Sequence, residues 1–124
     1  KTEYDRLALV QAAISGNDKF FLGTDSAPHV YGKKISTCGC AGIFSSPLAV
    51  PLLIQLFEEH NSLDTIEKFM SKNGRAFYGL EQQLDRVRYV KRSKSINTIK
   101  NIKTDVGKIT VFNPYNELYW ERIN

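Results

Sequence analysis

A helix, a tight turn and a short apolar run at the start of this 124-residue chain constrain its fold most. Apolar side chains recur at three- and four-residue spacing over residues 4–15, which predicts an amphipathic helix. A polar turn at residues 15–18 ends that helix, and the apolar run of residues 20–22 follows it. A short apolar run bounded by turns is typical of a strand buried on both faces, as in a parallel sheet. Helix, turn and buried strand together form half of a repeating α/β unit.

The rest of the chain divides into a long loop, a helical stretch and a β-rich end. Residues 25–46 show no sustained hydrophobic period and contain several Gly and Pro, which predicts a long loop. Loops of this length inside compact domains are uncommon and are frequently functional. The further predicted elements are a helix at 47–60, a helix after a capping box at 64–67, a break at Asn73-Gly74, a strand at 86–91, a loop at 93–104, and a hairpin of strands 108–112 and 118–123.

The positive charge of the chain is concentrated in one segment. The net charge is +4, yet the basic segment, defined as residues 86–108, holds eight Lys and Arg and a single acidic residue, Asp105. Clustered cations can neutralise nucleic-acid phosphates. Only Tyr89 is available there for base stacking and no nucleic-acid motif is visible, so we expect a solvated strand and loop, or a face toward another subunit, and no nucleic-acid partner.

Hydropathy and cysteine content indicate the compartment. No run approaches the roughly 18 apolar residues that a membrane span needs, and we expect no membrane partner. The two cysteines, Cys38 and Cys40, form no disulfide framework and are too few for a tetrahedral metal site. Free thiols indicate a cytoplasmic protein. The chain begins with Lys1 and not with Met, from which we expect a segment of a longer protein.

The residues with the strongest chemical signal directly follow the predicted buried strand. Asp25 lies where ligands bind in barrels and open α/β sheets, at the carboxyl end of a strand. A carboxylate there can ligate a metal or transfer protons, and His29 nearby can bind an anion or a metal. Spacing alone leaves the alternative open that Asp25 only caps the loop and that His29 is a surface residue.

Two separated strings carry a family resemblance. Residues 23–29 read Gly-Thr-Asp-Ser-Ala-Pro-His, and residues 38–42 read Cys-Gly-Cys-Ala-Gly. In this order and spacing they closely resemble the C-terminal part of dihydroorotase, of the single-function, bacterial-type class in the amidohydrolase superfamily. The resemblance covers residues 5–80 well and is weaker beyond, where the basic segment departs from the family pattern. It includes Phe57-Glu58-Glu59, Asn73-Gly74 and Phe77-Tyr78-Gly79-Leu80, and later only Pro114-Tyr115, Glu117 and Trp120.

The resemblance implies a fold, a cofactor and a reaction. The fold is α/β, with this chain forming the C-terminal segment of a (β/α)8 TIM-type metal-dependent hydrolase barrel with a short β-rich tail. Residues 1–80 would hold the last barrel helix, the final strand, the active-site loop and the closing helices, and residues 81–124 the tail of the same domain. Family members carry two zinc ions (Zn2+) bridged by hydroxide and a carboxylated lysine. They interconvert N-carbamoyl-L-aspartate and dihydroorotate in pyrimidine biosynthesis.

Residue roles are likewise implied by the resemblance. Asp25 matches the aspartate that ligates one zinc, acts as general base on the bridging hydroxide and then as acid toward the departing ring nitrogen. His29 matches the residue that holds the substrate carboxylate. The backbone of Ala41 and Gly42 matches the loop that also contacts the substrate, and residues without bulky side chains suit such contact.

The resemblance also says what this chain would lack. The other zinc ligands and the substrate-binding arginine of the family would precede residue 1, and the chain has only two histidines. We therefore expect three partners: the small-molecule substrate, the upstream part of the barrel, and a second copy in a homodimer. Residues 1–124 alone should be inactive.

Two alternatives are kept. A related cyclic amidohydrolase, such as a dihydropyrimidinase or an allantoinase, would share the fold, but the substrate-specific string at residues 38–42 argues against it. A non-catalytic binding module could also keep the fold. The presence of both Asp25 and His29 disfavours that function.

Overall fold

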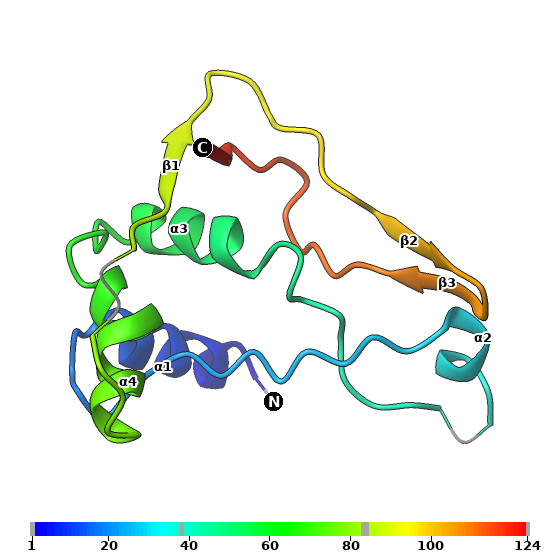
Figure 1. The fold of residues 1–124 in the computed structure, drawn as a ribbon, viewed down its shortest axis with the longest axis horizontal. Coiled ribbons are helices and arrows are strands. Elements are labelled where there is room, and N and C mark those ends of the chain that lie inside the picture. The colour runs from blue at the N-terminus through cyan, green and yellow to red at the C-terminus, as the bar shows by residue number, and fades with distance from the viewer. Residues whose placement is uncertain (1, 38, 83–84, 124) are drawn as a thin grey trace. The chain divides into compact units, whose positions relative to one another are not determined.

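The computed structural model describes residues 2–37, 39–82 and 85–123 (Figure 1). Its described residues form short helices before residue 78 and strands after residue 87. The elements are helices α1 (Glu3–Ile14), α2 (Tyr31–Lys34), α3 (Ala49–Glu59), the π-helix η1 (Lys68–Lys72) and α4 (Asn73–Phe77), and strands β1 (Arg88–Lys91), β2 (Asn101–Thr104), β3 (Gly107–Thr110) and β4 (Trp120–Ile123).

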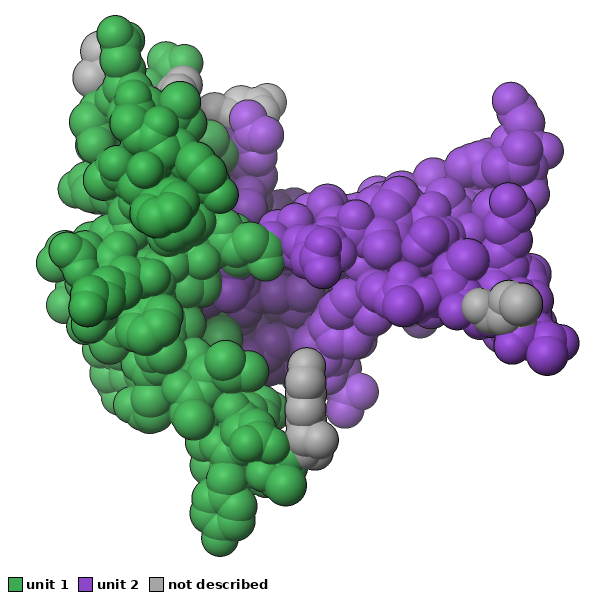
Figure 2. Space-filling model, turned by 90° about the horizontal axis from the view of Figure 1, so that it is seen from below, with its two compact units in different colours: residues 1–23, 56–87 green, residues 24–55, 88–124 purple. Residues whose placement is uncertain are grey.

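The chain divides into two compact units, which are described separately. Unit 1 comprises residues 1–23 and 56–87, and unit 2 comprises residues 24–55 and 88–124 (Figure 2). No helix among the described residues is long and apolar enough to cross a membrane.

Unit 1 begins with the predicted N-terminal helix. Thr2 caps α1 through a capping box, because its hydroxyl accepts from the Asp5 N–H while the Asp5 carboxylate accepts from the Thr2 N–H. Val10 is the buried residue of α1. Elsewhere in unit 1, Phe57 is fully buried at the end of α3, and its ring lies 5.7 Å from the ring of Phe69.

The predicted buried strand at residues 20–22 is wrong for this chain by itself. No strand is present at these residues, because a strand needs a hydrogen-bonded neighbour and no described strand pairs with them. Their support comes from helices instead: the Leu22 N–H donates to the Phe69 carbonyl at 2.9 Å, and the Asn73 side chain donates to the Phe20 carbonyl at 2.9 Å.

The predicted helix break at Asn73-Gly74 is also wrong. α4 begins at Asn73 directly after η1. Asn73 is 8% exposed and its side-chain amide donates to two carbonyls, so tertiary hydrogen bonds compensate its low helix propensity. Gly74 is accommodated because the Phe21 ring packs against it: a Cβ there would lie 3.1 Å from that ring.

Unit 2 contains two antiparallel two-stranded sheets, with different pairing from the prediction. β2 pairs with β3, and β1 pairs with β4. The predicted hairpin of strands 108–112 and 118–123 is therefore wrong, as is the loop across residues 101–104. The two-residue turn Asp105-Val106 closes β2 onto β3 locally, and β4 pairs with β1 instead.

A small core and one side chain stabilise unit 2. Leu48, Val111 and Leu118 are its buried apolar residues. The Gln55 side chain, 7% exposed, donates to the Glu117 carbonyl at 3.1 Å and accepts from the Tyr119 N–H at 3.1 Å. Gln55 thereby fixes the segment that leads into β4 against α3.

Candidate functional site

Asp25 occupies an exposed position with an unusual backbone conformation. Its φ is +45°, in the left-handed region that Asp and Asn tolerate better than other non-glycine residues. Its side chain is exposed and makes no hydrogen bond or ion pair with another described residue. The carboxylate is thus presented to the outside without a structural partner, which does not support the alternative that Asp25 only caps the loop.

The loop after Asp25 is held by its own polar atoms. The Ser26 hydroxyl accepts from the N–H groups of Ser45 and Ser46, at 3.1 and 3.0 Å. Ala27 donates its N–H to the Ile43 carbonyl at 2.8 Å. Residues nearly twenty positions apart are therefore joined at the base of the loop, and the loop returns to its starting point.

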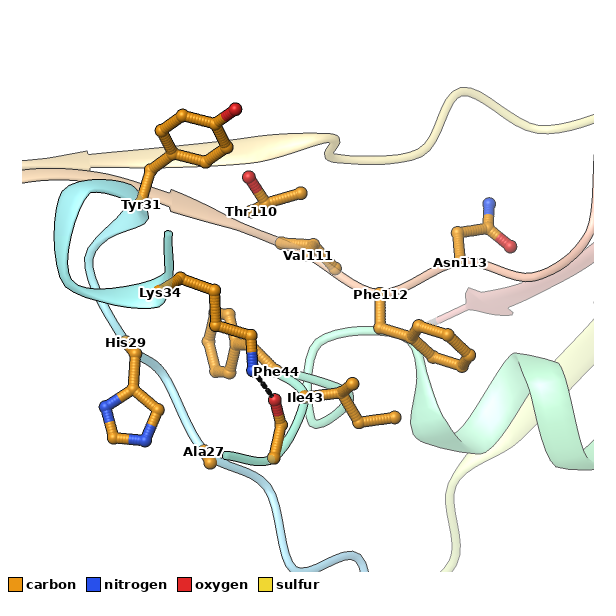
Figure 3. A pocket seen from close by; sticks show the side chains of 11 residues that line it. Ala27, His29, Tyr31, Lys34, Ile43, Phe44, Thr110, Val111, Phe112 and Asn113 are labelled. Carbon is orange, nitrogen blue, oxygen red and sulfur yellow. Dashed lines mark hydrogen bonds between the residues drawn. The ribbon is translucent and has the colours of Figure 1, made fainter. Parts of the chain in front are cut away.

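His29 and Gly42 both line a pocket of about 380 Å³ inside unit 2, which Figure 3 shows from close by. Lys34 is a cationic member of the lining, and no acidic residue belongs to it. An anionic small molecule is the ligand class that fits this charge. The lining residues are Ala27, His29, Tyr31, Lys34, Gly42, Ile43, Phe44, Thr110, Val111, Phe112 and Asn113.

Gly42 is required by geometry. Its φ is +91°, and a Cβ at this position would lie 2.6 Å from the Cβ of Ala27. Both the backbone conformation and the close approach exclude a side chain without a shift of the backbone. The glycine allows the backbone at residue 42 to pass directly against Ala27.

Lys34 connects the short helix α2 to the far side of the loop. Its ammonium donates to the carbonyl of Cys40 at 2.9 Å and to the carbonyl of Gly42, as Figure 3 shows for the latter. Sequence reasoning did not identify Lys34, because a lysine next to another lysine in a polar loop gives no signal for such a contact.

The hairpin of β2 and β3, which begins within the basic segment, also supports the loop. An isolated bridge joins Val30 to Ile109, and a Cβ at Gly107 would lie 2.4 Å from Val30. The Phe112 N–H donates to the Phe44 carbonyl at 2.8 Å. The two-residue turn after Thr104, followed by a glycine, was the signal in the sequence that could have predicted this hairpin.

The structure brings only part of the predicted site together. His29 and Gly42 line the pocket, whereas Asp25 and Ala41 are exposed and do not line it. Cys40 is a half-buried free thiol, and Cys38 lies outside the described residues.

The described residues do not form a metal site by themselves. They contain no group of three or more His, Cys, Asp or Glu side chains that could hold a metal ion. An exposed, unpaired carboxylate suits one ligand position, since zinc accepts carboxylate oxygens. The Asp25 carboxylate by itself can supply one oxygen ligand to such an ion.

Known proteins match the chain over nearly its whole length. No protein-family model matches it. The dihydroorotase of Ruegeria sp. (strain TM1040) is 47% identical over 120 residues, which are 97% of this chain and 35% of that protein. The dihydroorotase of Agrobacterium fabrum is 46% identical over 121 residues, which are 98% of this chain and 35% of that protein.

The solved structures that match the chain are also dihydroorotases. The crystal structure of dihydroorotase from Saccharomyces cerevisiae, in complex with 5-fluoroorotic acid, matches 99% of this chain and 35% of its own chain, with a TM-score of 0.85 and 35% identity. Dihydroorotase from Campylobacter jejuni matches 100% of this chain and 35% of its own, with a TM-score of 0.80 and 28% identity. The chain spans about a third of the length of these proteins. In sequence and in structure, the chain is thus related to the dihydroorotases and corresponds to their C-terminal part.

Proposed function

We propose that this chain is the C-terminal part of a dihydroorotase, which reversibly cyclises N-carbamoyl-L-aspartate to dihydroorotate. The observation that carries the proposal is the 47% identity to a dihydroorotase over 97% of the chain, including the loop that presents Asp25 and His29. The acid-free pocket with Lys34 supports a carboxylate-bearing substrate. The complex of the yeast relative with 5-fluoroorotic acid supports a pyrimidine carboxylate as the substrate class.

Asp25 is the proton-transfer residue of the proposed reaction. Its carboxylate oxygen accepts a proton from the attacking water during ring opening and then delivers it to the departing ring nitrogen. The absence of an ion pair or hydrogen bond from Asp25 to another described residue leaves this oxygen available for both steps.

His29, Ala41 and Gly42 hold the substrate. The half-buried imidazole of His29 donates a hydrogen bond to the substrate carboxylate, and the backbone N–H groups of Ala41 and Gly42 provide further donors. Hydrogen bonds to a charged acceptor are stronger than neutral ones, so three donors fix one carboxylate firmly.

We further propose zinc as the metal cofactor of the intact enzyme. Asp25 would be the ligand from this chain, and the remaining ligands would come from the upstream part of a (β/α)8 barrel. Bound zinc would lower the pKa of water toward about 7, which makes proton transfer to a carboxylate possible near neutral pH. The unpaired segment 20–22 of unit 1 supports the barrel, because neighbouring barrel strands would supply its missing hydrogen bonds.

The assay that tests the function uses the intact enzyme. Purified protein with zinc should interconvert N-carbamoyl-L-aspartate and dihydroorotate, and removal of the metal by a chelator should abolish turnover. Residues 1–124 alone, supplied with zinc, should show no turnover, because their described part contains no group of three or more side chains that could hold a metal ion. Turnover by the 124-residue fragment would contradict the proposed division of ligands.

A related cyclic amidohydrolase and a binding module are distinguished in the same assay. Turnover of dihydrouracil or allantoin in place of dihydroorotate would identify the former. Binding of dihydroorotate without turnover by the metal-loaded intact protein would identify the latter. Size-exclusion chromatography with light scattering tests the proposed homodimer.

A further inference from the structure

We propose that Lys34 is a positioning residue that aims the Ala41 N–H at the substrate. This inference rests on the proposed function for the identity of the substrate, whereas the geometry that carries it lies in the loop itself. The Lys34 ammonium contacts the carbonyls of Cys40 and Gly42, the two residues that flank Ala41.

The contact between Lys34 and the Cys40 carbonyl sets the direction of the Ala41 N–H, because both groups belong to one peptide unit. No described peptide bond is cis, and in a trans peptide the carbonyl and the following N–H point in opposite directions. Because the Cys40 carbonyl faces the ammonium, the Ala41 N–H of the same peptide group points away from Lys34. That N–H donates no hydrogen bond to another described residue, so it remains available for a ligand.

The neighbouring backbone groups are already engaged. The Cys40 N–H donates to the Lys33 carbonyl at 3.4 Å, and the Ile43 carbonyl accepts from Ala27. Lys34 adds the two carbonyls between these points. The loop is thus held on both sides of Ala41, and the Lys34 contacts are the side-chain contribution to that support.

The positive charge adds to the effect. Lys34 lines the pocket with His29, and no acidic side chain lines it. The ammonium therefore remains a net positive charge beside the loop, because carbonyl partners do not neutralise it. This charge favours an anionic substrate at the neighbouring N–H.

The adjacent lysine provides a matched control. Lys33 belongs to the same helix, α2, and is exposed, but its side chain makes no hydrogen bond or ion pair with a described residue. Lys33→Met and Lys34→Met are the same substitution at adjacent positions of α2, and each removes one positive charge. Only the second variant removes the contacts with the loop.

The test measures kinetics and hydrogen exchange in the intact enzyme. We expect Lys34→Met to raise KM for dihydroorotate about tenfold with kcat changed less than about threefold, since a ground-state contact is lost and Asp25 is untouched. Amide exchange over residues 39–43 should accelerate in the same variant. Lys34→Arg should restore most of both properties, because a guanidinium can donate to two carbonyls. Lys33→Met should match the wild type.

Each other outcome decides against the inference. A wild-type KM in Lys34→Met, an equal rise in Lys33→Met, or unchanged exchange over residues 39–43 would overturn it. A fall in kcat at constant KM would also overturn it. If the wild-type enzyme fails to turn over dihydroorotate, the proposed function falls instead, and the exchange measurement still decides whether Lys34 holds the loop. Circular dichroism of Lys33→Met, Lys34→Met and Lys34→Arg is the control that each variant is folded.

Discussion

The two sides of Asp25 differ in how the chain supports them. Before it, residues 20–22 have no described partner strand and are held by hydrogen bonds with η1 and α4. After it, the loop of residues 26–46 is closed by Ser26, clamped by Lys34 and supported by β3. The loop of residues 26–46 is therefore held by contacts within unit 2, whereas residues 20–22 would need neighbouring strands before they could form a strand.

The surface of unit 1 fits this difference. Its apolar pocket of about 570 Å³ is lined by α1 and residues 19–23, and Phe20 remains 43% exposed. In the proposed enzyme, neighbouring barrel elements would cover it.

Asp25 lies between the two regions, and its removal should have the largest effect on activity and almost none on stability. Asp25→Asn keeps the tolerated left-handed backbone but removes the proposed base, so kcat of the proposed enzyme should fall by about 10³-fold, within the range for general base catalysis. Zinc content of the proposed enzyme should stay largely unchanged, because its other ligands would come from the upstream part of the barrel. Steady-state kinetics and metal analysis measure both.

Asp105→Asn is the matched control for that substitution. Asp105 is an exposed carboxylate in the turn between β2 and β3, and its loss should leave kcat unchanged. Near-normal activity of Asp25→Asn would show that another residue is the base.

Gly42→Ala tests the locally specified loop. The new methyl group would overlap with Ala27 at a φ of +91°, so the free energy of unfolding should fall by about 2 kcal/mol or more. Substrate affinity should weaken with it. Urea unfolding and KM measurements report the two effects.

Gly32 in α2 offers the control, because a Cβ there would meet nothing within 4 Å. Gly32→Ala should be neutral or slightly stabilising, given the better helix propensity of Ala. Equal destabilisation by both alanines would mean that the loop is sensitive to any change and not to the contact with Ala27.

Asn73→Ala tests how residues 20–22 of unit 1 depend on their contacts with the helices. The buried amide donates to the carbonyls of Asn17 and Phe20, so its loss should cost about 1–3 kcal/mol of unfolding free energy. Hydrogen exchange at Leu22 should accelerate, because the start of the segment loses its anchor. Asn116→Ala, at an exposed side chain without a hydrogen bond to a described residue, should change neither. No acceleration at Leu22 would mean that the segment is held by other contacts.

Sequence reasoning predicted the parts of this chain whose signals are local. The helices predicted at residues 4–15 and 47–60 are confirmed by α1 and α3, because each helix forms its own hydrogen bonds. The strand at residues 20–22 failed for the opposite reason: a strand depends on partners that no local pattern supplies. The pairing of β1 with β4 joins residues about thirty positions apart, and only the tertiary structure reveals it.

The candidate site shows the same division. Asp25 and His29 were identified as candidates because residue type and position after an apolar run carry chemical meaning, and their roles remain predictions. Lys34 and Ser26 were missed, since their importance lies in backbone atoms that sequence does not place. Gly42 was identified for its lack of a side chain, and the structure adds the reason, its close approach to Ala27.

The smallest effect is expected at Glu67, an exposed side chain of unit 1 whose contacts join the helices to the segment before β1. Hydrogen bonds from Lys72 and Arg86 hold its pKa below the usual value of 4.5. A lowered pKa in the folded state means that the contribution to stability is present above about pH 4.5 and is lost as the pH falls through the lowered value. Glu67→Gln should therefore be slightly less stable than wild type at pH 7, and this difference should vanish in acid, as measured by urea unfolding across pH. Asp64→Asn, without a described ion pair, should show no comparable difference. If the difference in unfolding free energy between wild type and Glu67→Gln persists in acid, the effect of Glu67 comes from packing. Its contacts would then stabilise unit 1 independently of charge.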